Sequence, residues 1–200
     1  MIVNKSDIKS LTQQHKIFEQ IHLQYAAPPN WQRPTGFESL SKIILEQQVS
    51  LASAEAHFNS LKNYIKEFSA ANILKLTATE LRACYISKQK ASYLQALATA
   101  VVEQRIHFDL HASMQEQDIR NELVAVKGIG EWTANVYLMM CLQHKDIFPL
   151  GDIALQNAVK KLFSISHREE IKILSETWAP LRSLASYYLW HWYLCNKIKK

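Results

Sequence analysis

Glycine is scarce in this chain of 200 residues, which contains only four. Globular proteins average about 7% glycine, and hairpins between strands depend on it for their turns. Sustained alternation of apolar and polar residues is also hard to find, whereas apolar residues recur at helical spacing, as at Leu40, Ile43 and Ile44. These two observations argue against a β-rich fold, and we predict an all-α protein.

Long apolar runs are lacking too, and we expect no signal sequence. No apolar run approaches the roughly 18 residues that a membrane helix needs, and the nearest, 134–142, contains Asn135 and Tyr137. The amino terminus carries Lys5, Asp7 and Lys9 in place of an apolar signal core. We therefore expect no membrane partner and a cytoplasmic or nuclear location.

Cysteine is the third scarce residue. Cys84, Cys141 and Cys195 lie far apart in apolar surroundings, with no pair at metal-ligand spacing. This pattern predicts buried free thiols and no metal site. The net charge of +5 permits a nucleic-acid partner but does not establish one.

The helices that we expect are separated by clusters of proline and glycine. Breakers occur at 28–36, at 148–151 and at Pro180. We expect one unit over 1–200, built from a lobe over 38–146 that contains a hairpin at 116–143, and a lobe over 147–200 joined by segment 1–37, with a cleft near 147–152. The expected helices span residues 6–24, 37–62, 79–84, 88–105, 116–126, 131–143, 154–163, 168–177 and 181–195.

Three of the four glycines, Gly128, Gly130 and Gly151, fall within one short stretch. Two glycines two residues apart let the chain turn sharply with positive φ and bring bare amides close to a ligand. The next helix would begin near Glu131, and its first-turn amides, including those near Thr133, favour an anion such as a phosphate. Lys127 and Ile129 complete this hairpin. An ordinary helix corner with a glycine cap is the alternative.

Four stretches together resemble the helix-hairpin-helix (HhH-GPD) DNA glycosylase superfamily, and more closely its monofunctional 3-methyladenine branch. They follow the family's order and are residues 37–50, the basic turn near Lys88, residues 126–134 with 146–155, and residues 178–190. Three positions depart from the family pattern. Glu46 stands where a glycine is usual before two glutamines, Tyr85 where the second turn often has glycine, and Lys127 where many hairpins have proline.

The resemblance implies a fold, an activity and a partner. The fold would be two helical lobes with a helix-hairpin-helix motif and an active-site cleft between them, in a minimal helical version. The activity would be hydrolysis of the N-glycosidic bond of alkylated purines in duplex DNA, with the base flipped out of the helix. This hydrolysis would start base-excision repair. The enzyme would be a monomer, at the nucleoid of a bacterium or in the nucleus of a eukaryote.

Asp152 matches the catalytic aspartate of that family. Cleavage of the bond leaves an oxocarbenium-like sugar, which a nearby carboxylate stabilises while it orients or deprotonates the attacking water. An alkylated purine carries positive charge and leaves without an obligatory general acid. The alternative is structural, because an aspartate before an apolar helix is a competent N-cap, although both roles are compatible.

Trp132 lies two residues after Gly130, where bifunctional relatives have a lysine that forms a Schiff base. The resemblance therefore implies no lyase activity. It also implies no cofactor, because Cys195 alone cannot supply the four-cysteine iron–sulfur motif of the bifunctional branch. It leaves open a sodium or potassium ion at the hairpin carbonyls.

The resemblance places a flipped, cationic base between aromatic faces. Trp132 and Trp190 align with the family's pocket aromatics, and Val136 and Tyr137 would complete the pocket. Tyr187 is a further candidate, whereas Trp192 and Tyr193 fit the core better. The side chain that fills the gap in the base stack, the wedge, would be Gln48, with Gln47 as the second candidate. The alternative is a surface glutamine pair.

Arg182 and Ser183 also follow the family pattern, but a structural salt bridge explains the arginine equally well. Four lysines are candidate phosphate contacts and equally candidate solvated helix ends, namely Lys88, Lys90, Lys160 and Lys161. Two other functions stay open. One is a helix-hairpin-helix module that binds DNA without catalysis, and the other is a glycosylase for oxidised or mismatched bases.

Overall fold

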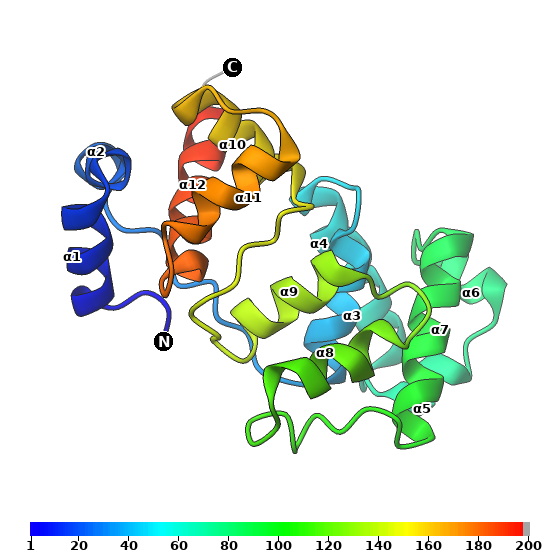
Figure 1. Ribbon diagram of the computed structural model, residues 1–200. Coiled ribbons are helices and arrows are strands. Elements are labelled where there is room, and N and C mark those ends of the chain that lie inside the picture. The colour runs from blue at the N-terminus through cyan, green and yellow to red at the C-terminus, as the bar shows by residue number, and fades with distance from the viewer. Residues whose placement is uncertain (198–200) are drawn as a thin grey trace. The chain divides into compact units, whose positions relative to one another are not determined.

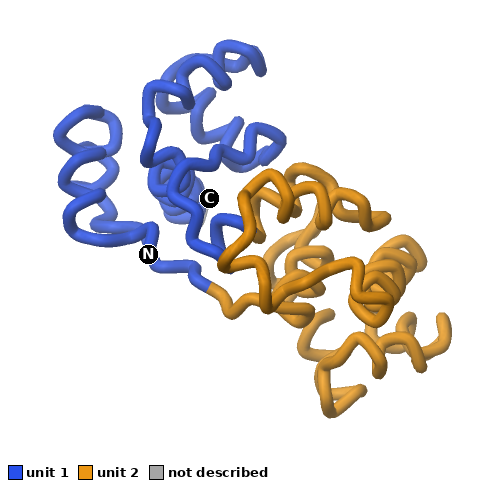
Figure 2. The backbone as a smooth tube through the Cα atoms, turned by 60° about the horizontal axis from the view of Figure 1, so that its bottom comes forward, with its two compact units in different colours: residues 1–32, 138–200 blue, residues 33–137 orange. Residues whose placement is uncertain are grey.

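The computed structural model describes residues 1–197, and this part of the chain contains twelve α-helices and no strand (Figure 1). The all-α prediction is confirmed. The backbone forms two compact units, one of residues 1–32 with the chain from 138 onward, the other of residues 33–137 (Figure 2). Helix α9 (Glu131–Met140) crosses the boundary in sequence. No described helix is long and apolar enough to cross a membrane.

The unit of residues 33–137 is organised around α3 and α7. Helix α3 packs on α4 and α7, and α7 also packs on α5 and α6. Leu40, Ile43 and Ile44, whose spacing predicted a helix, are fully buried, and each such side chain stabilises the fold by about 1.5–3 kcal/mol. The helices of this unit are α3 (Phe37–Glu46), α4 (Leu51–Ile65), α5 (Ala70–Leu74), α6 (Ala78–Ala83), α7 (Lys88–Val102) and α8 (Glu116–Val124).

The other unit is organised around α12, which packs against α1, α2 and α10. Its core is aromatic: Trp178 is buried and its ring contacts Phe18 and Phe163. The Tyr188 hydroxyl lies 2.8 Å from His22 Nδ1, and burial raises the pKa of Tyr188 to about 12. The helices are α1 (Lys5–Gln14), α2 (Lys16–Tyr25), α10 (Ile153–Phe163), α11 (Arg168–Glu176) and α12 (Arg182–Lys197).

Two expected long helices are each two helices. The helix predicted over 6–24 breaks at His15, whose backbone is extended with φ −132° and ψ 102°. The helix predicted over 37–62 ends at Glu46 and restarts at Leu51, where the Ser50 hydroxyl accepts a hydrogen bond from the Ser53 amide. Neither break contains proline or glycine. Because the apolar periodicity continues across both breaks, it predicted one helix in each place.

Smaller differences concern a short helix, two helix ends and a thiol. Helix α5 was missed because its five residues are too few to show a period. The helices expected over 88–105 and 131–143 end earlier, at Val102 and Met140. Cys84 and Cys141 are buried as expected, but Cys195 is only half-buried, with its Sγ 3.8 Å from His191 Nδ1.

Candidate functional site

The hairpin between α8 and α9 turns at Gly128. This residue has φ +91°, and a Cβ built on it would lie 2.1 Å from Tyr93 Cγ. Both the turn and the packing therefore require glycine here. The expectation of positive φ was wrong for Gly130, which lies outside that region and has nothing within 4 Å of a built Cβ. No contact within the described chain requires glycine at 130.

The residues around the turn divide into exposed and buried ones. Lys127 is exposed and Ile129 is buried. At the start of α9, the Ala134 amide donates to the Gly130 carbonyl at 3.0 Å. The Thr133 side chain, in the first turn of α9, is buried.

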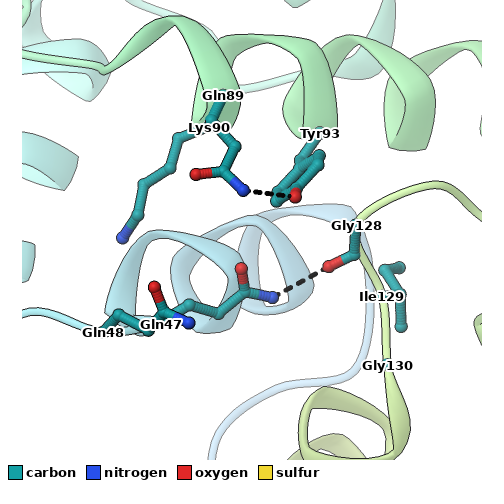
Figure 3. A pocket seen from close by; sticks show the side chains of 8 residues that line it. All are labelled: Gln47, Gln48, Gln89, Lys90, Tyr93, Gly128, Ile129 and Gly130. Carbon is teal, nitrogen blue, oxygen red and sulfur yellow. Dashed lines mark hydrogen bonds between the residues drawn. The ribbon is translucent and has the colours of Figure 1, made fainter.

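A polar hollow of about 370 Å³ opens beside the hairpin (Figure 3). Gln48 is exposed on one side, with a left-handed backbone at φ +56°. On the α7 side the Lys90 ammonium donates to the Leu45 carbonyl, and burial lowers the pKa of Lys90. The hollow is lined by Gln47, Gln48, Gln89, Lys90, Tyr93, Gly128, Ile129 and Gly130.

Two departures from the family pattern have local explanations. Glu46 forms a bidentate ion pair with Arg33, in which Nη1 and Nη2 of the guanidinium donate to the two carboxylate oxygens at 2.9 and 2.8 Å. Tyr85 adopts φ +63°, the region that favours glycine. Its exposed ring stacks on His57, with ring centroids 6.2 Å apart. The second turn therefore keeps the left-handed conformation with a tyrosine in place.

Asp152 caps α10 and contacts an aromatic side chain at the same time. Its Oδ1 accepts from the Leu155 amide at 2.9 Å and from the Trp190 indole N–H at 3.1 Å. Asp152 is only 8% exposed, so the residue is almost entirely buried. The structure thus confirms the capping role and brings together two of the predicted site residues.

Trp31 belongs to an aromatic cluster with Tyr187 and Trp190, and it was not predicted from the sequence. Its ring centroid lies 5.2 Å from that of Tyr187 and 6.3 Å from that of Trp190. It belongs to the proline-rich segment 28–34, which has no helical period from which a partner could be predicted. The presence of a tryptophan in such a segment was the only feature of the sequence that could have indicated a role for Trp31.

The other predicted pocket residues belong to the unit of residues 33–137. Val136 and Tyr137 are buried, and the Tyr137 hydroxyl lies 3.2 Å from Nδ1 of the buried His111. The opposite ring nitrogen of His111 lies 3.1 Å from a Glu122 oxygen. These contacts give Tyr137 a structural role in that unit's core. Trp132 is half-buried, and its place in a base pocket stays a prediction.

Arg182 and Ser183 connect α12 to the segment that precedes Asp152. Arg182 donates to both Asp146 oxygens, at 2.7 and 2.9 Å. The Ser183 hydroxyl donates to the His144 carbonyl, and the Ile147 amide donates to that hydroxyl. The salt-bridge interpretation of Arg182 is therefore the one that the contacts support. Lys88, Lys160 and Lys161 are exposed.

This ion pair predicts a pH-dependent stability. Arg182 lowers the pKa of Asp146, so the pair stabilises the fold above the unfolded value of about 4 and stops doing so as pH falls through the lower folded value. Asp146→Asn should lower the thermal midpoint by a few degrees at pH 7, and the difference should shrink at acid pH. Glu38→Gln, which removes an exposed partner of Lys62, is the control and should change little. A difference independent of pH would contradict this account.

Known proteins similar to this chain share both its sequence pattern and its fold. The sequence model described as HhH-GPD superfamily base excision DNA repair protein matches residues 41–182. A Bacillus subtilis DNA-3-methyladenine glycosylase is 28% identical over 175 residues, 78% of this chain and 57% of that protein. DNA-3-methyladenine glycosylase 1 of Schizosaccharomyces pombe is 28% identical over 161 residues, 77% of this chain and 71% of that protein.

The solved structure of a Schizosaccharomyces pombe 3-methyladenine DNA glycosylase in complex with abasic DNA has a TM-score of 0.85 to this chain. The match covers 93% of this chain and 95% of that one, at 23% identity, and so shows a shared fold. The chain spans little more than half the length of the Bacillus subtilis relative.

Proposed function

The chain belongs to the HhH-GPD superfamily of base excision DNA repair proteins, and from that membership we propose that it is a monofunctional DNA glycosylase. Its substrates are alkylated purines such as 3-methyladenine and 7-methylguanine in duplex DNA. The similarity to 3-methyladenine glycosylases of two organisms supports this substrate class. The protein acts where DNA is held, in the cytoplasm of a bacterium or the nucleus of a eukaryote.

The observation that carries the proposal is the paired contact of Asp152 with Leu155 and Trp190. Both donors meet the same oxygen, Oδ1, so they fix the orientation of the carboxylate. A fixed anion stabilises the positive charge that develops on the sugar as the base departs, without reorganisation at the moment of reaction. It also accepts the proton of the attacking water, and hydrolysis leaves an abasic sugar in an intact strand.

Trp132 supports hydrolysis over strand cleavage. It stands two residues after Gly130, and an indole cannot form the Schiff base on which lyase chemistry depends. The mechanism needs no cofactor, because water is the nucleophile and a cationic base is already a good leaving group. We therefore propose that strand cleavage follows only when the abasic product is treated with alkali.

The direct test is chromatography of the bases that the protein releases from methylated duplex DNA. Release of methylated purines, with the strand intact until alkali is added, is the expected result. Salt-sensitive DNA binding without any base release would favour the non-catalytic module instead. Release of oxidised or mismatched bases alone would point to a different glycosylase specificity.

Trp190→Phe tests the contact between the indole and Asp152. Phenylalanine keeps a ring for stacking but loses the N–H that donates to Oδ1. Because a hydrogen bond to a charged group is worth about 1.5–3 kcal/mol, we expect single-turnover release to fall by at least about tenfold. Trp192→Phe on the same helix is the matched control and should be close to wild type. Equal effects of the two substitutions would remove this role from Trp190.

A further inference from the structure

The two neighbouring glutamines at the end of α3 have different surroundings. Gln47 is half-buried, and its Nε2 donates to the Gly128 carbonyl and to the Thr133 hydroxyl, both at 2.9 Å. Figure 3 shows the bond to the hairpin. One amide group thus links the end of α3 to the turn of the hairpin and to the first turn of α9. Because this amide is held within the protein, Gln47 is unsuited to the role of wedge, for which it was the less favoured candidate.

Gln48 is exposed and adopts φ +56°, a conformation that residues with a side chain rarely adopt. Such a backbone persists only where its surroundings hold it. Each of the three residues before it makes a polar contact with another part of the same unit. Lys90 donates to the Leu45 carbonyl, Arg33 pairs with Glu46, and Gln47 is bound to the hairpin.

We infer that Gln47 is a positioning residue that joins the turn 47–50 to the hairpin, so that Gln48 and the hairpin meet DNA as one rigid element. The inference rests on the proposed function, because it assigns Gln48 the gap that a flipped base leaves. A primary amide suits the position, since its nitrogen carries two hydrogens for two acceptors. Methionine has a similar length but donates no hydrogen bond.

Gln47→Met is therefore the test variant, with Gln89→Met as its matched control. Gln89 lines the same hollow, but its side-chain amide donates to Tyr93 on its own helix. Release of 7-methylguanine is measured under single turnover from two duplexes. One has the lesion fully paired, and the other has it in a one-nucleotide bulge, where less unpairing and unstacking is needed.

We expect Gln47→Met to slow release from the paired duplex by about tenfold, as for the loss of two ordinary hydrogen bonds. Release from the bulge should change by less than about threefold. Gln89→Met should leave both rates near those of the wild type. An equal loss on both substrates would show a general folding or catalytic role and overturn the inference, as would no loss at all.

Two further results separate the possible failures. If the wild type releases no base from either duplex, the proposed function fails and not only this inference. If Gln47→Met does not fold, as judged by its thermal unfolding, Thr133→Val removes one of the two acceptors while keeping the side-chain shape. It should show the same selective loss on the paired duplex, to a smaller extent. Equal rates of this variant and the wild type on both substrates would overturn the inference.

Discussion

Asp152→Asn is expected to reduce base release by about 10²–10³-fold or more while leaving the fold and DNA binding intact. Asparagine keeps an Oδ1 that accepts from the Leu155 amide and the Trp190 indole, the two donors that hold the aspartate. It caps a helix about as well as aspartate does. The substitution therefore removes the negative charge and little else, so a loss of activity would report on chemistry.

The measurement is single-turnover release from methylated duplex DNA, accompanied by thermal unfolding and by binding to an abasic duplex. Glu131→Gln is the control, because it also removes one carboxylate, an exposed one that pairs with Arg120. It should retain release close to the wild-type rate. Undiminished release by Asp152→Asn would exclude Asp152 as the catalytic carboxylate, whereas binding without release by both proteins would favour the non-catalytic module.

The fold class could be predicted because helical periodicity is a local property of the sequence. The break at 47–50 could not, because it lacks the proline and glycine that usually mark an interruption. The Gln48 backbone is left-handed in spite of its residue type, and the residues before it make hydrogen bonds with partners distant in sequence. Such support becomes visible only once the chain is folded.

The candidate site shows the same division. Asp152 and Gly128 are visible in the sequence, because a cap and a turn need particular residue types at particular positions. The contact between Asp152 and Trp190 joins residues 38 positions apart, and Trp31 reaches Trp190 from the other end of the chain. Spacing within one segment carries no information on such contacts. Motif residues are thus predictable, and their partners are not.

Gly128→Ala is expected to have the largest effect on stability. Alanine is strained at φ +91°, and its Cβ would lie 2.1 Å from Tyr93 Cγ, so the ring or the hairpin must move. Strain and overpacking together should lower the free energy of unfolding by about 2–4 kcal/mol. Since the hairpin is the proposed phosphate contact, DNA affinity should fall as well. Denaturant unfolding and binding titrations measure the two effects.

Gly130→Ala is the matched control for Gly128→Ala, because Gly130 has no positive φ and open space where its Cβ would lie. It should unfold like the wild type. A loss of its DNA affinity without a loss of stability would show that DNA approaches the bare backbone at Gly130. Tyr93→Ala separates strain from collision: in that background Gly128→Ala should cost only its backbone strain, about 1–2 kcal/mol. An undiminished cost there would mean that the Tyr93 ring is not what requires glycine at 128.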